Sequence, residues 1–221
     1  MELLEFARGP ALSISIIIFI VGVLWRMIGI LALPFIKIPS RARTGVLPSG
    51  KVKGWFEGIW SRMWPHKNFV KPALFSTING YVFHIGLFIV VFLFAPHVVF
   101  IKDLTGLSWG SMPSNLVFAV GVITATSMVA ALIHRLTNPV QRLISNFNDY
   151  FSWFVTLAPV LTGLLAVSHL GPPYEKALAI HLLSVALLLI WFPFGKLMHA
   201  FLFVVSRGAT GARMKHRGAQ I

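Results

Sequence analysis

Six of the eight histidines in this chain of 221 residues lie within or at the ends of long apolar stretches. Ionisable side chains are rare inside a bilayer and mark candidate functional sites where they occur there. Neutral imidazole is also a strong axial ligand of haem iron. Haem ligation is therefore the first chemistry to consider for these six residues: His84, His97, His134, His169, His181 and His199.

Four of these histidines fall at two matching depths on two apolar stretches. At 1.5 Å per residue, His84 and His199 each lie roughly 10–14 Å from the inner end of their stretch. His97 and His181 lie near the outer ends of the same two stretches. This pattern predicts an inner haem held by His84 and His199, and an outer haem held by His97 and His181.

Helical angles support one of the two stretches better than the other. His181 and His199 are 18 residues apart, which is five whole turns of a continuous α-helix, so both would lie on one face about 27 Å apart. His84 and His97 are 13 residues apart and fall roughly 140° away from a shared face. We expect a kink at Pro96 in the second stretch.

Other interpretations remain open for each histidine. A lone intramembrane histidine can simply hydrogen-bond a neighbouring helix. His169, at the outer end of the fourth apolar stretch, is an alternative to His97 as the outer ligand, or a residue that lines a quinone pocket. His134 is best explained as a residue at the membrane interface.

Four further residues are candidates for roles around such haems. Lys102 and Asp103, in the outer loop after the second stretch, could handle protons at a quinone site, or belong to an ordinary solvated loop. Arg26 and Arg135 could pair with haem propionates. Snorkelling of Arg26 to the interface and anchoring by Arg135 explain these arginines equally well.

Composition identifies the class of protein that positions these residues. Only 11% of the residues are charged and the mean hydropathy is +0.80, whereas soluble domains have about 25% charged residues. A bilayer-crossing helix needs about 20 apolar residues. We therefore predict an all-α integral membrane bundle in one domain, residues 1–221, with five spans at about 11–35, 75–100, 115–134, 151–170 and 177–206.

The basic residues predict the orientation of the chain. They are concentrated after the first, third and fifth spans, which by the positive-inside rule places the N-terminus outside and the C-terminus in the cytoplasm. This distribution explains the net charge of +13 without nucleic acid. We therefore expect a multi-pass protein of the cell inner membrane. The absence of cysteine excludes thiolate-bound zinc or iron–sulfur clusters and covalent haem in this chain.

A basic cytoplasmic loop is expected at 37–74. Its apolar residues are spaced like one face of an interfacial helix, which favours either anchoring at lipid headgroups or docking of a cytoplasmic partner. They are Trp55, Phe56, Ile59, Trp60, Met63 and Trp64.

Two short motifs carry a resemblance to a known family. Phe83-His84-Ile85-Gly86, and the run from Phe192 to His199 (FPFGKLMH), resemble the gamma (cytochrome b) subunit of respiratory nitrate reductase. The 18-residue interval between His181 and His199 also resembles that of this family. The related subunit of a sulfur-metabolism complex is similar to this chain as well. In the family's pattern the outer histidine of the second span lies ten residues after the first. Here Phe94 occupies that position, and His97 follows three residues later.

The resemblance implies a fold and a function for almost the whole chain. It implies five helices with the N-terminus outside, two haems b and electron exchange with menaquinone or ubiquinone near the outer haem. It also implies an iron–sulfur subunit and a catalytic subunit on the cytoplasmic side, so that the chain is an electron-transfer subunit and not catalytic alone. The alternatives are a haem-free membrane anchor and a transporter that uses histidines to relay protons or ions.

Overall fold

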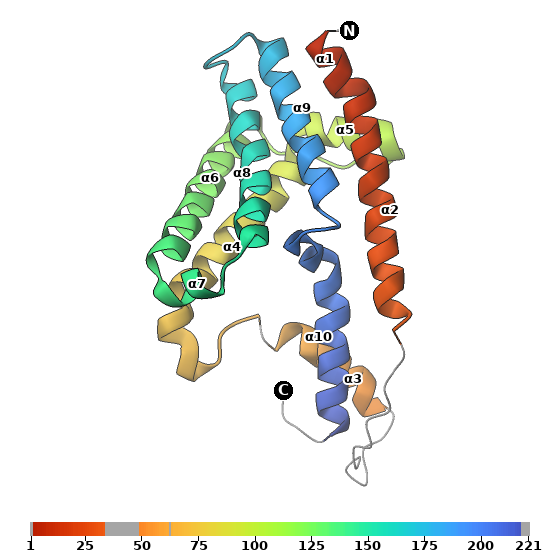
Figure 1. Ribbon diagram of the computed structural model, residues 1–221, viewed down its shortest axis with the longest axis vertical. Coiled ribbons are helices and arrows are strands. Elements are labelled where there is room, and N and C mark those ends of the chain that lie inside the picture. The colour runs from red at the N-terminus through yellow and green to blue at the C-terminus, as the bar shows by residue number, and fades with distance from the viewer. Residues whose placement is uncertain (1, 34–48, 62, 218–221) are drawn as a thin grey trace. The chain divides into compact units, whose positions relative to one another are not determined.

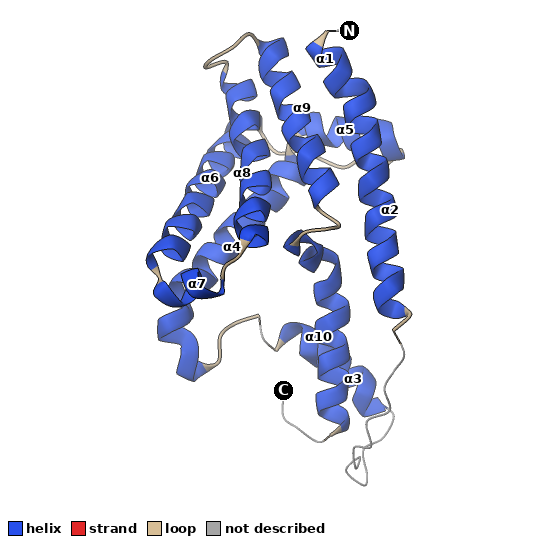
Figure 2. Ribbon diagram, in the orientation of Figure 1, coloured by secondary structure: helices blue, strands red, loops and turns tan. Residues whose placement is uncertain are grey.

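The computed structural model describes residues 2–33, 49–61 and 63–217, and all regular structure in this part of the chain is helical (Figure 2). Five of the described helical segments are long and apolar enough to cross a bilayer, which confirms the predicted fold class and number of spans. They are Leu3–Leu31, Lys67–Leu93, Ser114–Thr137, Phe147–Ser168 and Tyr174–Trp191. The chain divides into two compact units, residues 1–19 with 75–191, and residues 20–74 with 192–221.

The first span begins eight residues earlier than predicted. Helix α1 (Leu3–Phe6) continues through a π-helical turn (Ala7–Ala11) into α2 (Leu12–Leu31) without a break. The wide turn accommodates Pro10, which lacks the N–H that an α-helix would use at that position. The predicted end at residue 35 lies outside the described residues.

In unit 1, helices α4 (Val70–Leu93), α6 (Ser114–Thr137), α8 (Phe147–Ser168) and α9 (Tyr174–Trp191) form a bundle (Figure 1). Its buried core consists of Ala125 and Met128 of α6 with Leu157 and Val160 of α8. Polar groups also join the helices. Asn79 of α4 donates to the carbonyl of Ser127 (3.0 Å) and its amide oxygen accepts from the Ser127 hydroxyl (2.8 Å). Such interhelical bonds are common where lipid weakens the hydrophobic drive.

The second span ends earlier than predicted. Phe94 is extended (φ −81°, ψ 126°), and a separate helix α5 (Ala95–Thr105) follows and runs crosswise to α4 (Figure 1). In a continuous helix the ring of Pro96 would clash with the carbonyl of Phe92, whereas at the start of a new helix proline is well tolerated. The expected kink is therefore a complete break, and the predicted helix 75–100 is wrong beyond Leu93.

The fifth span is also interrupted. Helix α9 ends at Trp191, a turn containing Pro193 follows, and a 3-10 turn (Lys196–Met198) leads into α10 (His199–His216). The prediction of one helix over 177–206 is therefore wrong, and the five-turn relation between His181 and His199 does not apply. Proline cannot continue a helix because it has no N–H and clashes with the preceding turn.

Unit 2 contains α10 and the short helix α3 (Ser49–Trp60), which packs across it (Figure 1). The region after the predicted fifth span is thus a helix that continues to His216. Residues 37–48 of the predicted basic loop lie outside the described residues.

Candidate functional site

The rings of His97 and His181 face each other in unit 1. His97 lies in the first turn of α5 and His181 lies in the second turn of α9. The ring centres are 6.1 Å apart and the ring planes are within 13° of parallel. The break at Phe94 makes this possible, because His97 no longer follows the direction of α4.

The same break fixes the orientation of the His97 ring. Nδ1 of His97 donates to the carbonyl of Val90 (2.7 Å), in the last turn of α4. Helices end with carbonyls that have no partner within the helix. Two others in this turn accept from the following loop, Phe92 from the Trp109 indole (2.5 Å) and Leu93 from the Met112 amide (2.8 Å). A carbonyl can only accept, so Nδ1 of His97 carries the proton and Nε2 keeps a free lone pair.

Hydroxyl groups orient the His181 ring in a similar way. Nδ1 of His181 lies 3.2 Å from Oγ1 of Thr162 in α8. When the Thr162 hydroxyl donates to the carbonyl of Ala158 (2.8 Å), it can accept a proton from Nδ1 of His181, whose ring also hydrogen-bonds the backbone of Pro159. Ser184 lies 2.9 Å from the Thr162 hydroxyl and donates to the His181 carbonyl (2.7 Å). Both imidazoles can therefore have the same tautomer, with the proton on Nδ1.

Gly163 leaves room beside this ring. A Cβ atom at position 163 would lie 3.1 Å from Cε1 and 3.3 Å from Nδ1 of His181. A side chain at this point of α8 would therefore require the imidazole to shift by a few tenths of an ångström.

The distance between the two ring centres is compatible with a shared metal ion. Two imidazoles that bind one metal ion from opposite sides, at about 2 Å each, have ring centres about 6 Å apart. A haem iron needs only two protein ligands because the porphyrin supplies the rest, whereas a bare zinc ion takes three or four. Among the described residues no three His, Asp or Glu side chains gather as such a set would. The acceptors at Nδ1 match those that usually orient metal-binding histidines.

The two predicted inner ligands lie in different units. His84 belongs to α4, and its Nδ1 donates to the carbonyl of Gly80 (2.7 Å). His199 begins α10, and its Nδ1 donates to the carbonyl of Lys196 (2.8 Å). Each imidazole thus has the tautomer that a haem ligand needs. Their pairing across one haem stays a prediction.

The alternative outer ligand has other surroundings. His169 ends α8 with a positive φ of 54° and is exposed, and its ring centre lies 5.9 Å from that of Tyr174. The quinone-site candidates Lys102 and Asp103 are exposed on α5, the helix that carries His97. Arg26 is exposed on α2. The ring of His134 packs against the ring of Phe75, and the two ring centres are 4.6 Å apart.

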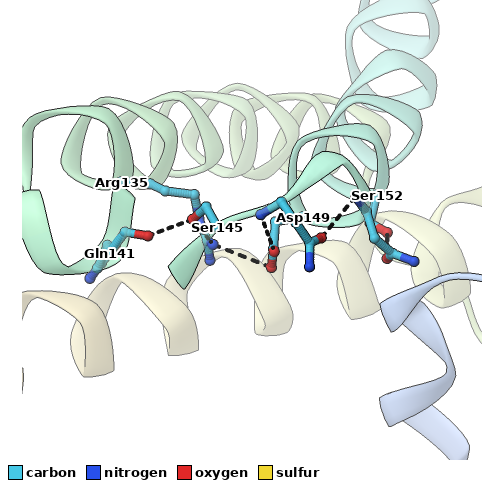
Figure 3. A network of polar contacts seen from close by, with 7 residues as sticks. Arg135, Gln141, Ser145, Asp149 and Ser152 are labelled. Carbon is cyan, nitrogen blue, oxygen red and sulfur yellow. Dashed lines mark hydrogen bonds and ion pairs between the residues drawn. The ribbon is translucent and has the colours of Figure 1, made fainter. Parts of the chain in front are cut away.

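Arg135 belongs to a polar network at the start of α8 (Figure 3). Its guanidinium lies 3.3 Å from the carboxylate of Asp149 and donates to the Ser145 hydroxyl (2.9 Å). Asp149 also closes a capping box with Asn146 at the helix N-terminus. This arrangement gives Arg135 a structural role that joins α6 to α8, beside the propionate role predicted from the sequence.

Sequence reasoning missed the residues that orient the outer pair. Thr162, Gly163 and Ser184 carry no local signal, since hydroxyls and glycines are frequent between membrane helices. One signal was available for His97. The adjacent Pro96 marks a helix start as well as a kink, and the end of the preceding helix would leave the carbonyl that the imidazole uses.

Comparison with known proteins gives one similar chain of unstated function. A protein of Nitratidesulfovibrio vulgaris (strain Hildenborough), named only "Protein", is 29% identical over 212 residues, which cover 93% of this chain and 91% of the relative. No family model matches the chain. No solved structure matches it either.

Proposed function

We propose that this chain is a di-haem cytochrome b, the membrane subunit of a respiratory complex. It exchanges electrons between membrane quinone or quinol and an iron–sulfur subunit on the cytoplasmic side. The observation that carries the proposal is the facing pair of His97 and His181, with parallel rings, matching tautomers and space kept by Gly163. The resemblance to the nitrate reductase gamma family supports the same function.

The residues of unit 1 have distinct roles at the outer haem. Haem b supplies reversible one-electron transfer when it is bound. His97 and His181 would hold it, and the Val90 carbonyl and the Thr162 hydroxyl contact the Nδ1 atoms of the two imidazoles and orient them. Hydrogen bonds at Nδ1 raise the basicity of an imidazole and so strengthen its bond to iron.

The inner haem is assigned to His84 and His199. Both residues match the family's motifs, and both donate from Nδ1 to a backbone carbonyl. With one haem toward each side, electrons cross an apolar region that contains no iron–sulfur ligands, because the chain has no cysteine. The electron path therefore needs a cytoplasmic partner with iron–sulfur clusters, and a catalytic subunit beyond it.

The quinone site belongs near the outer haem. Lys102 and Asp103 lie five and six residues after His97 and are exposed, so they can exchange protons with water. Quinol oxidation releases protons along with electrons, and such side chains can accept them. In this proposal the chain transfers electrons and is not catalytic alone. Its place is the cell inner membrane, with the N-terminus outside and the C-terminus in the cytoplasm.

Haem content of the purified protein tests the proposal. Reduced-minus-oxidised spectra should show b-type bands, with two haems per chain by pyridine haemochrome assay. His181→Ala and His97→Ala should each lose one haem, and the matched change His169→Ala should keep both. A protein without haem contradicts the proposal and favours the membrane anchor. If His169→Ala loses a haem while His97→Ala retains both, the outer ligand is His169.

A further inference from the structure

Helix α3 has an exposed apolar stripe that its contact with α10 does not cover. Val52, Phe56 and Trp60 follow one another at intervals of four residues, so they lie along one side of the helix. Their exposed fractions are 62%, 56% and 69%. Large apolar side chains this exposed, in a row, mark a surface that meets another apolar phase.

The opposite side of α3 is occupied by α10. Gly54 and Gly58 lie against the backbone of α10 so closely that a Cβ on either would collide with it, near Gly211. The guanidinium of Arg207 donates to the carbonyl of Ile59 (3.1 Å) and fixes the end of α3. Because Gly54 is two residues from both Val52 and Phe56, the stripe points away from α10.

The surroundings of the stripe are strongly basic. Glu57 is the sole acidic residue between Glu5 and Asp103 in the sequence. Its carboxylate is paired with Lys215 (2.8 Å) and Lys53 (3.7 Å), so it adds no free negative charge. The remaining charges on the described parts of α3 and α10 are positive. The surface around the stripe thus suits a negatively charged partner.

The length of α3 decides how such a stripe can meet lipid. Twelve residues extend about 18 Å, too short for a hydrocarbon core of about 30 Å. We propose that α3 lies flat in an anionic leaflet, with Val52, Phe56 and Trp60 inserted below the headgroups. Tryptophan is enriched at this level of the bilayer, and lysines beside an inserted helix attract lipid phosphates. This role does not depend on haem.

Site-directed spin labelling tests the proposal cleanly because the chain has no native cysteine. Phe56→Cys is labelled with a nitroxide in the full-length protein, reconstituted into vesicles of phosphatidylcholine with or without phosphatidylglycerol. Thr210→Cys is the control, at an exposed position of α10. Accessibility to oxygen and to a water-soluble nickel complex reports the depth of each label.

We expect the label at position 56 to favour oxygen over nickel in the anionic vesicles, and less so in phosphatidylcholine alone. The label at position 210 should favour nickel in both. Replacing Lys51 and Lys53 by glutamine should move the label at 56 toward water. Equal depth in both lipids overturns the anionic requirement, and a label at 56 that faces water in both overturns insertion and leaves a protein partner as the occupant.

Discussion

Replacing Thr162 by valine should weaken the outer haem without disturbing the bundle. Valine keeps the shape and β-branching of threonine but removes the hydroxyl that accepts the Nδ1 proton of His181 (3.2 Å). The imidazole then loses this hydrogen bond and keeps the one to the backbone of Pro159. Thr156→Val is the matched control, because Thr156 also lies on α8 and its hydroxyl donates within the helix to the carbonyl of Ser152 (2.7 Å).

The expected size follows from the lost hydrogen bond. A typical intramolecular hydrogen bond contributes about 0.5–1.5 kcal/mol. Loss of a hydrogen bond that orients a metal-binding histidine lowers metal affinity about 10- to 100-fold. We therefore expect Thr162→Val to bind the outer haem about 10- to 100-fold more weakly. Since the imidazole also becomes less basic, the midpoint potential of that haem should rise, by about 60 mV for each tenfold loss that affects only the oxidised form.

Haem titration and a potentiometric redox titration of the purified protein measure both effects. Thr162→Ser, which restores a hydroxyl, should recover most of the affinity and potential, and Thr156→Val should match the unmodified protein. The reasoning fails if Thr162→Val keeps the affinity and potential of both haems. It also fails if Thr156→Val shows the same loss, because the effect would then come from the packing of α8.

Three further changes test the packing and the charges. Gly86→Ala should lower the free energy of unfolding by about 1–3 kcal/mol, because its Cβ would collide with Thr124 of α6; thermal unfolding in detergent measures this loss. Asn79→Ala should cost about 0.6–1.7 kcal/mol by the same assay, since it removes the hydrogen bonds between α4 and α6. The hydrogen bond from Lys215 lowers the pKa of Glu57, so this pair stabilises the folded protein above the ordinary pKa of glutamate. That contribution is lost as the pH falls through the lowered pKa of Glu57. On acidification to that range, the Glu57→Gln variant should therefore lose less stability than the unmodified protein.

The number and type of the long helices could be predicted from the sequence because both depend on local composition. Their interruptions could not be placed by the same means. Hydropathy stays high through Phe94 and again through Phe192, so an apolar window passes over both breaks. Pro96 and Pro193 mark the breaks, but a proline in a membrane helix can kink it, end it or be accommodated, as Pro10 is in a π-helical turn. The outcome depends on which neighbours satisfy the freed backbone groups.

The candidate site was also only partly predictable from the sequence. Depth along the spans correctly brought His97 and His181 to one level, and the structure places their rings together. The helical angle between His84 and His97 argued against this pairing, because it was calculated for a helix that continues unbroken to His97. Thr162 and Gly163 could not be recognised, since their roles arise from the approach of α8 to α9, which no interval in the sequence records.

Both interruptions come shortly before a histidine, and at the first of them this relation has a physical reason. A broken helix leaves carbonyls without partners, which is costly in a bilayer unless other donors reach them. After the first break the His97 ring donates to the carbonyl of Val90, and after the second the His199 ring donates to the carbonyl of Lys196. The His97 imidazole thereby satisfies a carbonyl at the end of α4 and is itself held in one orientation. The first break therefore provides a ring of fixed orientation, which a metal-binding histidine requires.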